Sequence, residues 1–360
     1  MPRDLLSPRA AGAVPCVVVD NGSGVIKTGF AGEEEPHSLL PAQGLAGAGD
    51  GRPLSQGIVR DWDMMEAYWD YAFTHQLHVD TEQCNLLVTC NMFETKDNKE
   101  RMMQSLFETF AAPAVFSSPP PVFELYASGK ENGVVVGLGA QCTYAVLMHE
   151  GLHDPRTLLR SDVAGEALDR WTAQLLQQVS GGAVDLAHAC KLKEALGVVS
   201  VEGASDGAEA AYELPDGRKL TLSAEQRAQI TEPLFTPGLV GEACGGLPQL
   251  VGDCIKLRDR DGALESKTLG KDGTDAWFRN VILAGGGSCF PCLAERLQSE
   301  LLVWAPRGAS PEVHAPPERK HAAWLGGSIL GSLSVMDQMW ITKEEYDENG
   351  PLIVHRKCLF

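Results

Sequence analysis

Two stretches of the chain repeat one pattern, β-branched residues followed by a glycine turn, and this repeat limits the folds available to the chain. Val17–Gly24 reads VVVDNGSG, and Val134–Cys142 reads VVVGLGAQC. Each apolar run predicts a buried strand that turns at the glycines into a second strand. Backbone amides at such a turn are suited to binding an anion. The repeat therefore predicts two related α/β halves with a ligand cleft between them.

Apolar periodicity predicts the remaining elements. A third buried run, Val281–Ala284, also enters glycines, and it precedes a helical pattern at Leu293–Leu301. We expect a proline cluster at Ser117–Phe123 to interrupt the helical pattern before it, and a polar tail to follow Trp324–Leu333. The other expected elements are helices at 62–77, 96–110, 162–179 and 185–196, a strand at 85–89 and a hairpin at 212–222.

Length and composition exclude several classes of protein. A chain of 360 residues suits two domains with a sizeable core. A net charge of −18 argues against direct nucleic-acid binding, because phosphate contacts need a basic face. The ten cysteines show no spacing typical of a disulfide framework, and the sequence has no apolar signal segment, so we expect reduced thiols in a cytosolic or nuclear setting. It also has no run of about 18 apolar residues, so we expect no membrane span.

Several longer segments resemble the actin family. They include Asp20–Pro36, Tyr212–Gly217, Ala315–Lys320 and, above all, Trp324–Cys358. The resemblance implies an actin-like ATPase fold, with two lobes, each a mixed sheet flanked by helices, around a central nucleotide cleft. It further implies a first lobe at 15–125 whose outer subdomain is reduced to a loop at 41–57, a second lobe at 126–320, and a C-terminal segment at 321–360 that returns to the first lobe. Composition alone predicts a disordered leader at 1–14 and, within the second lobe, a polar loop at 202–210 and a charged insertion at 256–276.

The resemblance also implies a site for ATP or ADP. Asp20 would hold a hydrated cation through water, and Lys27 would place a positive charge near the phosphates. The alternative is that the turn retains the family sequence without binding phosphate, and that side chains fill the cleft. Cys190 stands where the family has an arginine, so one of the residues that would contact the nucleoside is missing. The residues carried over are Asp20, Asn21, Gly22, Ser23, Gly24, Lys27, Lys193, Glu194, Gly285, Gly286, Gly287 and Lys320.

The second glycine loop departs from the family pattern. Gly137 and Ala140 stand where actins carry aspartates, Leu138 replaces a serine, Tyr144 replaces a histidine, and Pro120 replaces the glutamine that places the attacking water. Losing groups that orient a water or stabilise a transition state costs orders of magnitude in rate. We therefore expect no hydrolysis, and we assign neither a catalytic residue nor a metal ligand; the losses also count against Mg²⁺ or Ca²⁺ binding.

The loop at 41–57 is too short and too rich in glycine to rebuild the outer subdomain of an actin. That subdomain carries a loop that reaches the next subunit of a filament. Because a filament repeats one heterologous contact indefinitely, removing half of that contact blocks the repeat. We therefore expect no actin-like homopolymer.

The family's surface for partner helices is better preserved. Leu125–Gly129 and Met336–Trp340 resemble the strip around that apolar groove. We expect Ile329 and Leu330 to belong to the core instead. Cytoskeletal or actin-binding proteins are the partners that the resemblance implies.

Two short motifs suggest other chemistry. His149–His153 reads HEGLH, but zinc-protease chemistry needs this motif on a helix, and here it ends a predicted strand. Cys289–Cys292 is a C-x-x-C pair that follows a glycine turn, outside a thioredoxin-like βα unit. We expect neither to define a site.

The leading hypothesis is a non-catalytic actin-like structural protein of the cytoplasmic cytoskeleton that acts by binding partners. A slow ATPase that uses Asp20 and Lys27 is the enzymatic alternative. A chromatin-associated actin-related subunit is a third, by family analogy alone. Divergent actin-like proteins also occur in male germ cells, so the resemblance extends to a role in sperm.

Overall fold

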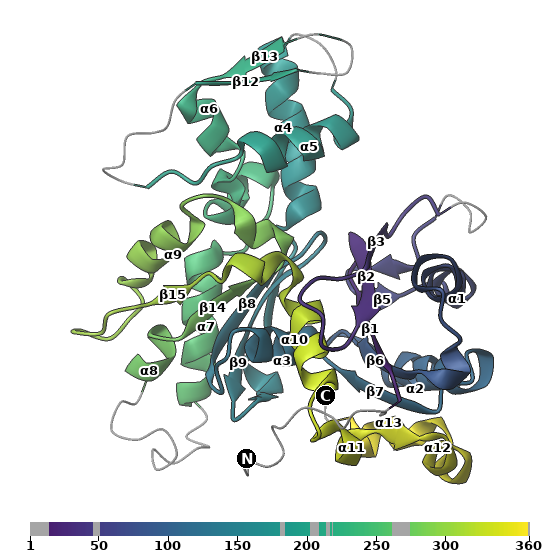
Figure 1. Cartoon of the computed structure of the whole chain (residues 1–360). Coiled ribbons are helices and arrows are strands. Elements are labelled where there is room, and N and C mark those ends of the chain that lie inside the picture. The colour runs from purple at the N-terminus through teal and green to yellow at the C-terminus, as the bar shows by residue number, and fades with distance from the viewer. Residues whose placement is uncertain are drawn as a thin grey trace. The chain divides into compact units, whose positions relative to one another are not determined.

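The computed structural model describes residues 14–45, 51–180, 184–201, 209–213, 217, 219–260 and 274–358. The chain divides into two compact units. The first unit comprises residues 1–131, 151–153 and 321–360, and the second comprises residues 132–150 and 154–320. Each unit has a mixed β-sheet with helices packed on it (Figure 1). The two mixed sheets agree with the α/β fold class expected from the sequence, in which each lobe has a mixed sheet flanked by helices.

The sheet of the first unit has the strand order β16-β7-β6-β1-β2-β3. Strands β1, β6 and β7 run parallel, whereas β2, β3 and β16 are antiparallel to their neighbours. Every residue of β6 and β7 is buried, as expected for central strands covered on both faces. The bounds are β1 Cys16–Asn21, β2 Val25–Phe30, β3 Ser38–Pro41, β6 Asn85–Thr89, β7 Ala114–Ser118 and β16 Ile341–Thr342.

Helices of the first unit confirm the periodic patterns in its sequence. The helix expected at 62–77 forms as α1, Trp62–Asp70, which continues as a π-helix over Tyr71–Leu77. The one expected at 96–110 forms as α2, Lys96–Gln104, with a π-helix over Ser105–Thr109. The remaining helices are α3 Pro120–Ala127, α10 Ala322–Gly331, α11 Met336–Met339, α12 Lys343–Asn349 and α13 Val354–Lys357.

Helix α10 lies in the core of the first unit, against α3 and β1. Gly326 allows the close approach of α10 to α3, because a Cβ at this position would lie 1.7 Å from the carbonyl oxygen of Phe123. Trp324 is fully buried, and its indole Nε1 donates to the carbonyl of Val18 at 3.3 Å. The apolar sequence of α10 thus ties the C-terminal part of the chain to β1 (Figure 1).

Three expectations for the first unit are wrong. The proline cluster does not leave an irregular break, since Ser117 and Ser118 end β7 and Pro120 begins α3. The tail after α10 is not simply polar, because it contributes β16 and three helices. Ile329 is 36% exposed and so is not a core residue, whereas Leu330 is buried as expected.

The sheet of the second unit runs β9-β8-β14-β15, and β11 pairs with β9. Strands β8 and β9 form the predicted antiparallel unit, and β14 lies parallel to β8 on its other side. The hairpin β8–β9 therefore repeats the arrangement of β1–β2 in the first unit, as the repeated sequence predicts. The bounds are β8 Gly133–Leu138, β9 Thr143–His149, β11 Leu159–Ser161, β14 Val281–Ala284 and β15 Val313–His314.

The helices of the second unit also follow the predicted pattern. Helix α9 occupies the predicted residues, Leu293–Leu301, and buries its leucines against the sheet. The predicted hairpin forms as β12, Ala210–Glu213, and β13, Lys219–Leu222, while most of its turn lies outside the described residues. The other helices are α4 Gly165–Ser180, α5 Leu186–Leu196, α6 Ala224–Gln229, α7 Leu247–Arg260 and α8 Asp275–Phe278.

The segments expected to be loops are described only in part. Within 41–57, Ala42 and Leu54 are buried, and β4, Leu54–Ser55, pairs with β5, Ile58–Val59, so this stretch is partly ordered against the first unit. Helix α7 extends to Arg260, four residues past the start of the expected charged insertion at 256–276. Residues 1–13, 46–50, 202–208 and 261–273, which include most of the expected leader and polar loop, lie outside the described residues.

Candidate functional site

The first glycine turn is organised around an ion pair between neighbouring strands. Asp20 on β1 lies opposite Lys27 on β2, and Lys27 Nζ is 2.6 Å from Asp20 Oδ2. Thr89 Oγ1, at the end of β6, donates to the other carboxylate oxygen at 3.2 Å. The two charged side chains are 14% and 8% exposed. Both oxygens of the carboxylate expected to hold a hydrated cation therefore have partners within the chain.

Asn21 uses its polar atoms to fix the end of β1. Its backbone N–H donates to Thr89 Oγ1 at 2.8 Å, and its side-chain Nδ2 donates to the carbonyl of Thr89 at 3.1 Å. Its Oδ1 accepts from the indole Nε1 of Trp69 at 3.1 Å. Asn21, predicted to face a phosphate, instead joins β1 to β6 and to α1.

The rest of the turn is also tied to its surroundings. Gly22 donates its N–H to the carbonyl of Asp20 at 3.0 Å, and Ser23 Oγ accepts from the N–H of Gly57 at 2.8 Å. The carbonyl of Gly24 accepts from Ala42 at 3.0 Å. In this turn Ser23 is half-buried and Gly24 is exposed. Ser23 Oγ, which accepts from Gly57, still carries a hydroxyl proton to donate.

The second glycine turn has no room for the carboxylate that the family carries there. Gly137 on β8 lies opposite Tyr144 on β9 in the strand register. A Cβ built on Gly137 would lie 2.2 Å from Cζ, 2.5 Å from Oη and 2.6 Å from Cε1 of Tyr144. Distances below 3.0 Å are not found around real Cβ atoms, so any side chain at position 137 would displace this ring. The tyrosine thus fills the space in which an aspartate would stand.

The loop after β8 closes on itself and on helix α4. Gly139 donates its N–H to the carbonyl of Cys142 at 2.9 Å. The carbonyl oxygens of Gly139 and Ala140 accept from the N–H groups of Gly165 at 3.0 Å and Glu166 at 2.7 Å. These are among the first N–H groups of α4, which in other proteins attract anions. Here they are satisfied by the loop.

Leu138 packs its backbone and side chain against the third glycine turn. Gly285 has φ +83°, and a Cβ there would lie 2.4 Å from the carbonyl oxygen of Leu138. At Gly287 the nearest atom is Leu138 Cβ, at 3.1 Å from the position of an added Cβ. Gly286 has open space on its Cβ side. Packing against Leu138 and the positive φ therefore require glycine at position 285, and position 287 is tightly packed against the same residue.

Pro120 lies at the first turn of α3. The missing N–H of proline costs nothing there, because the first N–H groups of a helix have no partner within it. The local sequence thus forms a good helix start, but the ring has no amide with which to orient a water. The position that places the attacking water in the family offers no such group here.

On the nucleoside side, Lys193 is engaged by α4. Its Nζ lies 2.7 Å from Asp169 Oδ1 and donates to the carbonyl of Gly165 at 3.1 Å, and the side chain is only 7% exposed. One turn earlier on α5, Cys190 Sγ donates to Glu194 Oε1 at 3.8 Å. Burial raises the pKa of the Cys190 thiol to about 11, so it stays neutral at pH 7. Asp169 was not predicted from the sequence, where nothing distinguishes it from other helical acids.

The two additional motifs take the local structure expected of them. His149 ends β9 and His153 belongs to β10, Leu152–His153, so HEGLH is not helical. His149 Nδ1 lies 2.8 Å from Asn132 Oδ1. Cys289 and Cys292 are both exposed, with Cys292 directly before α9. Among the residues that the structure describes, no group of three or more His, Cys, Asp or Glu side chains is arranged to hold a metal ion.

A divalent cation of the actin type does not fit these residues. The Asp20 carboxylate is bound by Lys27 and Thr89, and the second turn offers Gly137 and Ala140 where oxygen ligands would be needed. Mg²⁺ and Ca²⁺ bind through carboxylate and carbonyl oxygens and ordered water. The donor set is thus poorer in anionic oxygens than the resemblance implies.

Comparison with known protein families supports the reading of the fold. The family described as Actin matches residues 47–194 and 186–359. These two segments cover most of the chain, and with the two mixed sheets they define an actin-like protein. The chain belongs to the actin family. The first turn, with Asp20 and Lys27, precedes the matched segments, so its assignment depends on the local sequence and geometry.

Membrane insertion by a helix finds no support in the described part of the chain. No helix there combines the length and the apolar composition needed to cross a bilayer.

Proposed function

We propose that this chain is a non-catalytic actin-like structural protein that acts by binding partners in the cytoskeleton. The packing of Tyr144 into the Cβ space of Gly137 carries the proposal. This packing removes a carboxylate that the family uses, and it fills the place with a side chain that belongs to the folded sheet. The position at which the family has a carboxylate, Gly137, is therefore buried in the sheet of the second unit.

The proposal predicts no ATP hydrolysis. The water-placing amide, the histidine and two carboxylates are absent together, at Pro120, Tyr144, Gly137 and Ala140. A phosphate-release assay on the purified full chain with magnesium and ATP should match the protein-free control. The variant Lys27→Met distinguishes a contaminant from the chain itself. Release that Lys27→Met abolishes would establish the slow ATPase alternative, which the retained Asp20–Lys27 pair favours.

Nucleotide binding without hydrolysis is a separate part of the proposal. Ser23 and Gly24 still have donor groups for a phosphate, whereas Lys27 and Lys193 are paired with Asp20 and Asp169. We expect ATP or ADP to bind weakly and without an increase when magnesium or calcium is added. Calorimetric titration with and without EDTA tests this. Affinity that rises steeply with magnesium would contradict the degenerate cation site, while no heat at any metal concentration would show that the cleft takes no nucleotide.

We also propose that the chain does not polymerise as actins do. In place of the family's outer subdomain, the described residues of 41–57 contribute the buried Ala42 and Leu54, and the strand β4, which pairs with β5 just after this stretch. Sedimentation of the pure chain in magnesium and salt should leave it in the supernatant. A polymer pellet would refute this part while leaving the absence of hydrolysis intact.

Family membership favours cytoskeletal partners and a cytoplasmic location. Purification of the chain from native tissue, male germ cells included, with identification of co-eluting proteins, tests this. Association with actin-binding proteins would support the proposal. Recovery only with chromatin-remodelling complexes would replace it with the chromatin-associated alternative.

A further inference from the structure

The second unit contains a cavity apart from every residue assigned to the nucleotide site. Its volume is about 360 Å³, and it lies between helix α4, the end of strand β13 and helix α6. Sites for small molecules occupy about 300–1,000 Å³. The cavity is therefore large enough for a small organic molecule.

The floor of the cavity is apolar and its rim is polar but neutral. Leu176, Leu222 and Ile230 are each nearly or fully buried and form the floor. Gln178 and Gln229 lie at the exposed rim. None of the described residues that line the cavity carries a charge. In a chain with a net charge of −18, this lining favours a neutral ligand over an anion.

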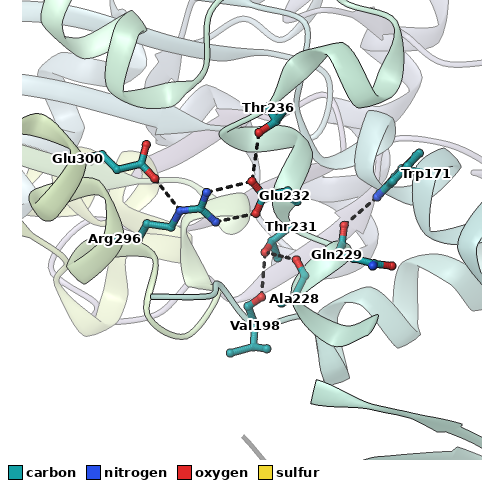
Figure 2. A network of polar contacts seen from close by, with 9 residues as sticks. All are labelled: Trp171, Val198, Ala228, Gln229, Thr231, Glu232, Thr236, Arg296 and Glu300. Atoms are coloured by element: carbon teal, nitrogen blue, oxygen red, sulfur yellow. Dashed lines mark hydrogen bonds and ion pairs between the residues drawn. The ribbon is translucent and has the colours of Figure 1, made fainter. Parts of the chain in front are cut away.

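The wall formed by α6 is held in place by contacts on both of its ends. Ser223 and Gln226 form a capping box at its start. At its end, the indole Nε1 of Trp171 on α4 donates to the carbonyl of Gln229 at 2.8 Å, and Thr231 Oγ1 donates to the carbonyl of Val198 at 2.8 Å (Figure 2). A wall fixed in this way keeps the cavity open without a ligand, so binding costs little reorganisation.

Gln226 gives the cavity a directed hydrogen-bond donor. Its Oε1 accepts from the backbone N–H of Ser223 at 2.9 Å, which fixes the orientation of the amide. Gln226 lines the cavity, and an amide that accepts through Oε1 still has its two Nε2 hydrogens to donate. A ligand that fits has an apolar body and a carbonyl or similar acceptor.

We propose that this cavity binds a small neutral molecule with an apolar body and a hydrogen-bond acceptor. The site is separate from the nucleotide site and does not depend on the absence of hydrolysis. The ligand is defined here by its chemistry: neutral, compact and amphipathic.

The test uses two naphthalene dyes of different charge and the intact chain. Prodan is neutral and carries one ketone acceptor, whereas anilinonaphthalene sulfonate is anionic. We expect prodan to bind at one saturable site per chain with a blue shift in emission, and the sulfonate to bind at least tenfold more weakly. Absence of saturable prodan binding, or equal binding of the two dyes, would overturn the proposal.

Matched substitutions locate the binding. Gln226→Glu keeps the capping box, since glutamate serves at the same position, but it removes the amide donor and adds a charge. It should weaken prodan binding about tenfold. Gln174→Glu, on an exposed position of α4 outside the lining, should have no effect.

A second variant covers the case in which Gln226→Glu changes the fold. Leu175→Trp, at a half-buried lining position, should fill the cavity and abolish binding while circular dichroism stays unchanged. Equal affinities of Gln226→Glu and Gln174→Glu, or full binding by Leu175→Trp, would show that the dye binds elsewhere.

Discussion

Replacing Gly137 with aspartate restores a carboxylate that the family carries, yet the structure predicts that it destabilises the protein. The new Cβ would lie 2.2 Å from Cζ of Tyr144, and the residue is buried on β8. Overpacking of a core costs about 1–3 kcal/mol. Burying a carboxylate without a partner adds further cost, partly relieved by protonation. We expect Gly137→Asp to lower the free energy of unfolding by about 3 kcal/mol or more.

The ring of Tyr144 should be the cause, and a double-mutant cycle tests this. Tyr144→His removes the phenol, so the pair Gly137→Asp/Tyr144→His should recover at least 1 kcal/mol relative to the sum of the single changes, within the range of about 0.5–3 kcal/mol for residues in contact. Tyr144→Phe is the matched control, because it keeps the ring atoms Cζ and Cε1 that lie 2.2 and 2.6 Å from the added Cβ. It should give little rescue.

Urea denaturation of the wild type, the three single variants and the two pairs of Gly137→Asp with Tyr144→His or Tyr144→Phe, followed by circular dichroism, measures these differences. An unchanged midpoint for Gly137→Asp would show that the ring moves aside at no cost. Equal rescue by Tyr144→Phe and Tyr144→His would show that the ring is not what excludes the carboxylate. Either result would refute the packing that carries the proposed function.

Four further predictions concern stability. Arg296→Lys should lower the free energy of unfolding by about 1.5–3 kcal/mol, because Arg296 donates to both carboxylate oxygens of Glu232, at 2.7 and 2.9 Å (Figure 2). A lower midpoint of urea denaturation would show this loss. Burial raises the pKa of Glu232, but the hydrogen bonds from Arg296 outweigh burial, so this pKa lies below its ordinary value of 4.5. The stability advantage of the wild type over Glu232→Gln should therefore be complete above pH 4.5 and disappear in stronger acid. Equal stability of the two proteins at pH 7 would show that the ion pair contributes nothing. Asp20→Asn should cost about 3–5 kcal/mol by leaving Lys27 buried without its partner, and adding Lys27→Met should recover part of it; additive losses would contradict the pairing. Gly326→Ala should cost about 3 kcal/mol or more in thermal unfolding, since its Cβ would overlap the α3 backbone; a change under 1 kcal/mol would show that α10 moves freely.

Periodic apolar patterns were sufficient to predict most elements, and the failures have specific physical causes. Strand β6 and helix α9 have the predicted bounds because their apolar residues match one period throughout. The break predicted at the proline cluster is wrong because proline is favoured in the first turn of a helix, and α3 begins at Pro120. Thr342 and Glu345 form a capping box that starts α12, a signal present in the tail that was read only as polar.

The chemistry of the site was less accessible from the sequence than its location. The sequence shows directly which carboxylates are missing, but it does not show which contacts the retained residues make. Asn21 has the family identity, and its partners Thr89 and Trp69 lie 68 and 48 residues away along the chain. Such contacts depend on how β1, β6 and α1 pack, and no local pattern encodes them. Retention of a residue therefore did not establish that its former role was retained.

The two glycine turns depart from the family pattern in different ways. The first turn keeps Asp20 and Lys27, and these two side chains form an ion pair with each other. The second turn has exchanged two facing residues, so that Gly137 and Tyr144 now complement each other in the core. A side chain at position 137 and the ring of Tyr144 compete for the same space, so restoring this one carboxylate alone should weaken the strand pair β8–β9 that holds it.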